Sequence, residues 1–199
     1  MLALCALFAL SDAQAPPTLA RTFCTDKLDQ TSVDGKVSPA LTFKYRLCVD
    51  TDRKSWRRSD SGVGDLIFNG THLITISVRR GYTCSVSPPY QGDPLKAMPF
   101  TALVIDAGAT PNGTTTLDGV DADVWVAHRD AVPAARQPDE FMYWYVSAAR
   151  ALVRATADVK PQGDYPQGAL LTYDYFASGN FTTDVPPGTF KPPPETKCS

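Results

Sequence analysis

The chain has 199 residues, a formal net charge of −2 and 43% hydrophobic residues. A chain of this length is expected to fold as one domain. The nearly neutral charge gives no reason to expect nucleic acid as a partner, because binding to a phosphate backbone depends on many Lys and Arg contacts. After residue 15 no apolar run approaches the roughly 20 residues of a membrane span, so no transmembrane anchor is expected.

The N-terminus has the features of a secretory signal peptide. Residues 1–10 are apolar and uncharged, and two small-x-small triplets follow, Ser11-Asp12-Ala13 and Ala13-Gln14-Ala15. This pattern predicts a signal peptide over residues 1–15, with cleavage after Ala13 or Ala15. A buried first helix is the alternative interpretation. The rest of the chain is expected to form one β-rich binding domain over residues 22–199.

Removal of a signal peptide would also remove Cys5 and leave four cysteines, Cys24, Cys48, Cys84 and Cys198. An even number of cysteines in an exported chain indicates two disulfide bonds, for which three connectivities are possible. A zinc site is the competing use, but it normally needs close pairs such as C-x-x-C, which are missing here.

Three Asn-x-Thr sequences, at Asn69, Asn112 and Asn180, are potential N-glycosylation sites. Two of them are Asn-Gly pairs, which also favour tight hairpin turns. We therefore expect exposed sites on a glycoprotein that is secreted, or that is delivered to the lumen of an acidic vesicle.

The hydrophobic pattern has mainly a period of two residues, which is typical of β-strands. In the segment 41–49 every odd residue is apolar, which predicts a half-buried strand with its odd side chains in the core. Further strands are predicted over residues 54–58, 65–68, 72–78, 82–84, 100–105, 120–128, 141–146, 152–159 and 170–176. The tail over residues 185–194 is rich in proline and is expected to be extended. We predict a mostly β fold: a single domain of curved antiparallel sheets that form an open half-barrel or sandwich, with few short helices.

Two of the predicted strands are apolar on both faces. Residues 100–105 are expected to form a central strand that is buried on both sides. Residues 141–146 are apolar or aromatic throughout, which indicates either cover on both faces or an uncovered surface that could form a lipid-sized groove. The alternative is that these side chains only fill the core.

Catalytic motifs are lacking. The chain has only His72 and His128, and neither H-E-x-x-H nor G-x-S-x-G occurs. The protein is therefore not expected to be an enzyme, although a hydrolase-type site built from scattered Asp and His residues is an open alternative. The acidic stretch 118–123 resembles the start of a calcium loop, but Arg129 at the twelfth position excludes an EF-hand. A looser site with oxygen ligands could bind calcium, and no other cofactor is expected.

The order of segments along the chain resembles the ependymin-related proteins and the wider group of eukaryotic exported LolA-like domains. The segments concerned are 41–49, 54–58, 65–68, Cys84 to Pro89, Gly119 to Trp125, 141–146, 173–176, and the stretch from Pro187 to Cys198. The resemblance implies a curved antiparallel half-barrel around an apolar pocket, and for some members calcium-linked matrix adhesion. With this family in mind, we expect the disulfide pairs Cys24–Cys48 and Cys84–Cys198.

The leading functional hypothesis is a carrier that binds a lipid or a fatty-acid-like molecule in an apolar pocket. The alternative is an extracellular adhesion or recognition module that binds glycans, matrix or a partner protein. For the carrier, the residues expected to contact the ligand are Phe43, Tyr45, Phe68, Ile74, Ile76, Phe100, Leu103, Ile105, Phe141, Tyr143, Tyr145, Tyr173 and Tyr175.

Overall fold

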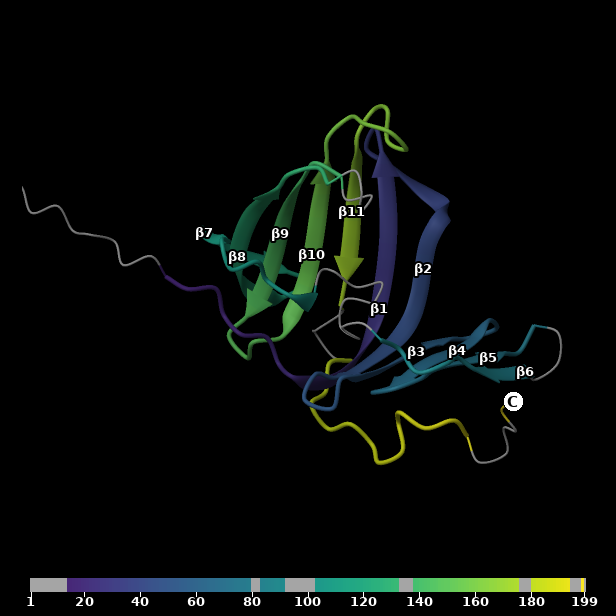
Figure 1. Ribbon diagram of the computed structural model, residues 1–199. Helices are drawn as coiled ribbons and strands as arrows, with labels where there is room; N and C mark the ends of the chain where they lie inside the picture. Colours follow the sequence, from purple (N-terminus) through teal and green to yellow (C-terminus); the bar gives the residue numbers. More distant parts are fainter. Residues whose placement is uncertain are drawn as a thin grey trace, which may run out of the picture.

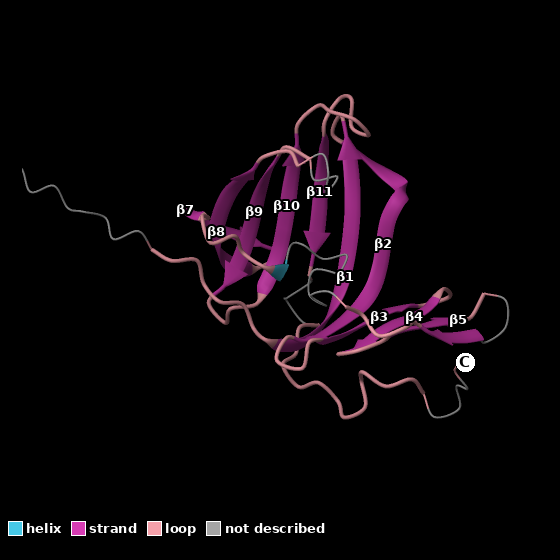
Figure 2. Ribbon diagram, viewed as in Figure 1, coloured by secondary structure: helices cyan, strands magenta, loops and turns pink. Residues whose placement is uncertain are grey.

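A computed structural model describes residues 14–79, 83–91, 103–132, 138–175, 180–193 and 198. These residues form eleven β-strands and no α-helix, with a single short helical turn at Leu103 (Figure 2). The strands are β1 (Thr22–Val33), β2 (Lys36–Asp50), β3 (Ser55–Asp60), β4 (Gly64–Asn69), β5 (Leu73–Ser77), β6 (Thr83–Val86), β7 (Thr110–Leu117), β8 (Val120–Arg129), β9 (Glu140–Ser147), β10 (Leu152–Val159) and β11 (Ala169–Asp174). The predicted mostly β fold is therefore confirmed.

All eleven strands belong to one open antiparallel sheet with the order β6-β5-β4-β3-β2-β1-β11-β10-β9-β8-β7. The sheet consists of two meanders, β1–β6 and β7–β11, which are joined only where β1 pairs with β11. Figure 1 shows that β3–β6 run in a different direction from β8–β11, so the sheet is bent between them. Strands β6 and β7, which follow each other in the chain, form the opposite edges of the sheet.

One prediction about the strands is wrong. Residues 103–105 lie in the connection before β7 and form no strand, and residues 100–102 are outside the described part. The apolar side chains of Leu103 and Ile105 instead pack against the main hydrophobic core, which is described below. The sequence pattern predicts neither β1 nor β7. The segment over residues 152–159 forms a strand with the predicted bounds.

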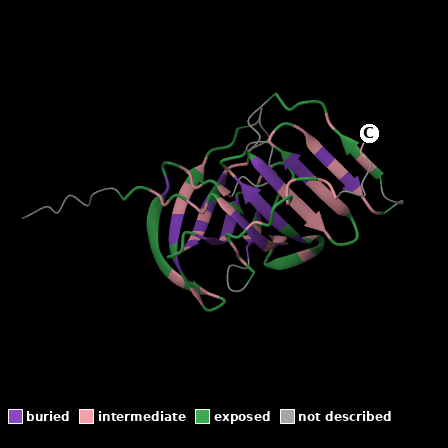
Figure 3. Ribbon diagram, turned by 90° about the horizontal axis from the view of Figure 1, so that it is seen from below, coloured by how far each residue is buried: buried purple, intermediate pink, exposed green. Residues whose placement is uncertain are grey.

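The main core lies on one face of the sheet, which we call the inner face. Strand alternation places Tyr45, Leu47 and Val49 of β2 on this face, all of them buried. Trp144 of β9 is fully buried there and lies opposite both Trp125 and Ala155 on the neighbouring strands. Figure 3 shows the buried residues concentrated in the strands, although β7 and the first part of β2 are largely exposed.

A smaller core covers the outer face of the first meander. Ile67, Ile74 and Ile76 are buried there, and Phe190 and Cys198 of the C-terminal tail pack against them. The tail thus shields apolar side chains that a one-sided sheet would leave in water.

Both expected disulfide pairs are present. Cys24 and Cys48 lie directly opposite each other on β1 and β2 and are bonded. Cys84 of β6 is bonded to Cys198, which fastens the C-terminal tail to the edge of the sheet. In the part of the chain described here, no helix has the length and hydropathy that a membrane crossing requires.

Candidate ligand-binding site

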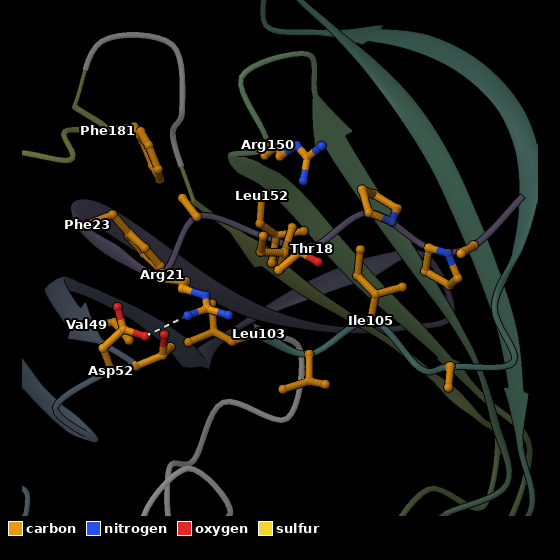
Figure 4. Close-up of a pocket in the computed structure, with 18 residues that line it drawn as sticks. Thr18, Arg21, Phe23, Val49, Asp52, Leu103, Ile105, Arg150, Leu152 and Phe181 are labelled. Atoms are coloured by element: carbon orange, nitrogen blue, oxygen red, sulfur yellow. Dashed lines mark hydrogen bonds and ion pairs between the residues drawn. The ribbon is translucent and has the colours of Figure 1, made fainter.

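A hollow of about 660 Å³ lies against the inner face, near the start of β1 and the end of β2 (Figure 4). Its floor includes Phe23 of β1, Val49 of β2 and Leu152 of β10. The N-terminal segment 15–21 and the connection 103–107 provide further walls. The hollow therefore exists because two irregular segments cross a sheet face that would otherwise be open. We refer to it below as the apolar pocket.

The floor is held by strand pairing and by aromatic stacking. Phe23 and Val49 are opposite each other in the β1–β2 register, so both project into the pocket. The ring of Phe181 stacks on Phe23 with centroids 5.2 Å apart. Backbone hydrogen bonds in both directions between Cys24 and Thr182 fix Phe181 in this position. The apolar floor is thus held in place by contacts within the protein.

Polar groups line only the border of the pocket. Arg21 and Asp52 form an ion pair at 3.0 Å, and their side chains are 68% and 61% exposed. The amide of Ala20 donates to the carbonyl of Arg150, and the amide of Thr51 donates to the carbonyl of Arg21. These two bonds attach the N-terminal segment to the β9–β10 turn and to the end of β2.

A buried polar cluster occupies the inner face further along β1. The ammonium of Lys27 lies 2.6 Å from Asp29 and donates a hydrogen bond to the hydroxyl of Tyr45 at 2.8 Å. The rings of Tyr45, Tyr173 and Tyr175 surround it, with centroids 5.0 to 5.2 Å from the nitrogen. Burial lowers the pKa of Lys27 to about 8, against the opposing charge of Asp29. Burial and the charge of Asp29 raise the pKa of each of the three tyrosines.

A second ionic group lies beneath the connection before β7. Arg129 of β8 forms two hydrogen bonds to Asp106, at 2.7 and 2.9 Å, and a weaker one to Glu140 at 3.4 Å. Burial by itself lowers the pKa of Arg129, but the bonds and charges of Asp106 and Glu140 raise it overall. This arrangement ties the connection to the second meander and helps to position Leu103 and Ile105 over the core.

The predicted ligand residues fall on both faces of the sheet. Of those described, Leu103 and Ile105 line the apolar pocket. Tyr45, Tyr173 and Tyr175 surround Lys27 instead. On the inner face of β2 and β4 lie Phe43, which is 45% exposed, and Phe68, which is buried. The remaining described members project from the outer face: Ile74, Ile76, Phe141, Tyr143 and Tyr145. Phe100 is outside the described residues.

Several pocket residues carry no signal in the sequence. The segment 15–21 begins at the last residue of the predicted signal peptide and has no periodic pattern. Phe23 belongs to a strand that the pattern does not predict, and Arg150 lies in a turn. Only the three-dimensional crossing of these segments brings them together.

Two other hollows are more polar. One of about 430 Å³ is lined by Tyr45 together with charged residues of β1–β4 such as Asp26 and Arg46. The other, of about 610 Å³, lies between the end of β2 and residues 183–190 of the tail. Neither has the apolar lining of the first.

One of the two histidines pairs with a carboxylate at the surface of the sheet. His128 lies 3.0 Å from Asp139 and stacks on Phe141 at the outer face. Hydrogen bonds from Lys160 and His128 lower the pKa of Asp139. The pair lines none of the three hollows described above. His72 lies in the β4–β5 turn.

The acidic stretch 118–123 spans the β7–β8 turn, at residues 118 and 119, and the first four residues of β8. Asp118 bonds to Arg154 at 3.1 Å, and Asp121 accepts a hydrogen bond from Thr116. Across the residues that the structure covers, no three His, Cys, Asp or Glu side chains converge as metal ligands would.

No protein-family model matches the sequence, and no curated protein matches it at a significant level. Among solved structures, an uncharacterized conserved protein from Thermus thermophilus is similar over 92% of this chain and 91% of its own, with a TM-score of 0.54 and 10% identity. At this identity the similarity shows a shared fold and nothing about function.

Two further structures superpose less well. The lipoprotein LppX of Mycobacterium tuberculosis has a TM-score of 0.41 and 8% identity, over 82% of this chain and 88% of its own. A DUF1329 family protein from Desulfovibrio piger has a TM-score of 0.31 and 14% identity, over 86% and 90%. The evidence for a shared fold is therefore the similarity to the Thermus protein.

Proposed function

We propose that this protein is an exported carrier that binds a hydrophobic molecule, such as a lipid or a fatty acid, in the apolar pocket. The observation that carries the proposal is the composition of the pocket wall, in which thirteen of eighteen residues are Ala, Pro, Val, Leu, Ile or Phe. The volume of about 660 Å³ falls within the range of roughly 300–1,000 Å³ that is typical of small-molecule sites.

Export is supported by several independent features. The predicted signal peptide over residues 1–15 and the two disulfide bonds suit an oxidising compartment. Asn69, Asn112 and Asn180 all have exposed side chains, as glycan acceptors require. The destination is the extracellular space or an acidic vesicle.

Membership of the LolA-like group, with the ependymin-related proteins as the nearer relatives, is part of the same proposal. The open antiparallel sheet with irregular segments across its inner face agrees with what that resemblance implies. The order of the sequence segments supports the ependymin-related assignment.

Uptake of a fluorescent fatty acid by the purified, delipidated protein tests the carrier function. Ala107 lines the pocket and is exposed in the connection before β7, so Ala107→Trp should fill the pocket and lower the affinity at least about fivefold without unfolding the sheet. Ala131→Trp is the matched control, because Ala131 is also exposed but does not line the pocket. An absence of uptake by the wild-type protein, together with no lipid in native mass spectra, would refute the proposal.

The outer face favours a second candidate, recognition of a glycan or a matrix partner. Phe141, Tyr143 and Tyr145 project from this face of β9 at every second position, and Phe141 is 36% exposed. Aromatic rings in such a row can stack on the apolar faces of sugars. Binding to a glycan array that disappears in Tyr143→Ala and persists in Ala107→Trp would support this candidate over the carrier.

A further inference from the structure

The border of the apolar pocket has an excess of positive charge. It contains two arginines, Arg21 and Arg150, but only one carboxylate, Asp52. Arg21 is already paired with Asp52 at 3.0 Å. Arg150 forms no ion pair with any residue that the structure describes. Among the residues that the structure describes, none supplies a counter-charge to the Arg150 guanidinium at the border of this largely apolar pocket.

The position of Arg150 is fixed by its backbone. Its amide donates to the carbonyl of Ser147 at 2.8 Å, and its carbonyl accepts a hydrogen bond from the amide of Ala20 at 3.0 Å. The first bond closes the β9–β10 turn and the second ties this turn to the N-terminal segment. Figure 4 shows the side chains of Arg150 and Arg21 on different sides of Leu152.

We propose that the ligand is an anionic amphiphile with a single alkyl chain, whose carboxylate or phosphate headgroup pairs with Arg150 while its chain lies on Phe23, Val49 and Leu152. This inference rests on the proposed carrier function and adds the chemical class of the ligand. The planar guanidinium presents parallel N–H donors that match both kinds of headgroup. Arg21 lies at the same border but is already paired with Asp52, so the headgroup is assigned to Arg150.

The charge should decide between ligands of equal chain length. An alcohol with the same alkyl chain can bury the same apolar surface, but it supplies no counter-charge to Arg150. Because Arg150 is exposed, solvent and salt weaken its attraction to an anion. We therefore expect a preference for the anion of about fivefold at low ionic strength, which shrinks as salt is added.

The experiment compares palmitate, hexadecyl phosphate and hexadecanol by displacement of Nile red from the full, delipidated chain. At least one of the two anions should bind about fivefold more tightly than hexadecanol, and comparison of the two identifies the headgroup. Arg150→Gln should weaken binding of that anion about fivefold and leave hexadecanol unchanged. Arg53→Gln is the control, because Arg53 is an exposed arginine of the β2–β3 turn that does not line this pocket.

The outcomes separate this inference from the function on which it rests. Equal affinity for all three molecules, or an equal loss for all three in Arg150→Gln, would overturn the anionic class while leaving the carrier function intact. Failure of all three molecules to displace the probe would overturn both.

Discussion

The ammonium of Lys27 lies 2.6 Å from a carboxylate oxygen of Asp29, two residues further along the same strand. Lys27 has no exposed side-chain surface, and Asp29 is 21% exposed. Both side chains project from the inner face of β1, where an unpaired charge would be strongly destabilising. Their pairing, together with the hydroxyl of Tyr45, allows a strand with charged residues at core positions to be buried.

The free energy of unfolding should rise with pH above neutrality. Burial lowers the pKa of Lys27 from 10.5 to about 8, so between these values the unfolded chain binds a proton that the folded protein has lost. Stability therefore increases over this window, by on the order of 3 kcal/mol. Above pH 10 it should fall, because Tyr45, Tyr173 and Tyr175 have raised pKa values when folded and ionise first in the unfolded chain.

Urea denaturation at a series of pH values measures this profile, and we expect a maximum near the ordinary pKa of tyrosine, 10.0. In the variant Lys27→Met the free energy of unfolding should no longer rise between pH 8 and 10, but it should still fall above pH 10. A wild-type profile that is flat between pH 8 and 10 would contradict the prediction.

Removal of Asp29 from the buried ion pair should lower the free energy of unfolding more than removal of an acidic residue from a surface ion pair on the same strand. Asp29→Asn leaves the Lys27 charge buried and should lower the free energy of unfolding by about 3 kcal/mol at neutral pH. The matched control is Asp26→Asn, which breaks the more exposed pair with Arg46 at 3.1 Å and should cost less than about 1 kcal/mol.

The double variant Lys27→Met with Asp29→Leu tests whether the loss of stability in Asp29→Asn comes from the unpaired buried charge of Lys27. It should recover most of the loss in urea denaturation, because it removes both charges and keeps apolar volume. A double variant that is less stable than Asp29→Asn would show that the pair itself contributes net stability.

The N-terminal segment should affect ligand binding without affecting the fold. A chain that begins at Leu19 lacks the pocket residues Ala15, Pro16, Pro17 and Thr18 but keeps every strand, since β1 begins at Thr22. Fatty-acid affinity should fall by on the order of 1–2 kcal/mol as apolar contact area is lost. The urea midpoint should stay unchanged, and an unchanged affinity would show that this wall does not contact the ligand.

Asn69 should contribute to stability even without a glycan. Its Oδ1 accepts hydrogen bonds from the amides of Thr71 and His72 at 3.1 and 2.9 Å, and Gly70 supplies the positive φ of 95° that the turn needs. In unglycosylated protein Asn69→Gln should cost about 1 kcal/mol of unfolding free energy. Asn112→Gln should change it by less than about 0.5 kcal/mol, and similar losses in both variants would exclude this role.

The period-two pattern identifies most strands but does not find β1. From residue 23 to residue 29 of β1 the inner-face positions are Phe23, Thr25, Lys27 and Asp29, so only the first of these four is apolar. The polar residues are buried because β2, β11 and their tyrosines satisfy them. Those contacts come from distant parts of the chain, and no local pattern records them.

Apolar composition alone also cannot separate a strand from a covering segment, or one face of a strand from the other. Leu103 and Ile105 are apolar because they cross over the core, although the same pattern suits a buried strand. On β9 both faces are apolar, and only the pairing with β8 and β10 shows that Trp144 is inside and Tyr143 outside. By contrast, Val153 to Val159 alternates clearly, and its odd residues are buried as the pattern predicts.

The junction between the two meanders has a consequence for folding. Every other pairing in the sheet joins strands that are neighbours in the chain, so most hairpins can form locally and early. Leu28 and Asp174, by contrast, must find each other across most of the sequence, which makes this closure the slow step. During synthesis one edge of β1 therefore stays unpaired until β11 has emerged. We expect mispairing, or binding of a chaperone, to occur first at this edge.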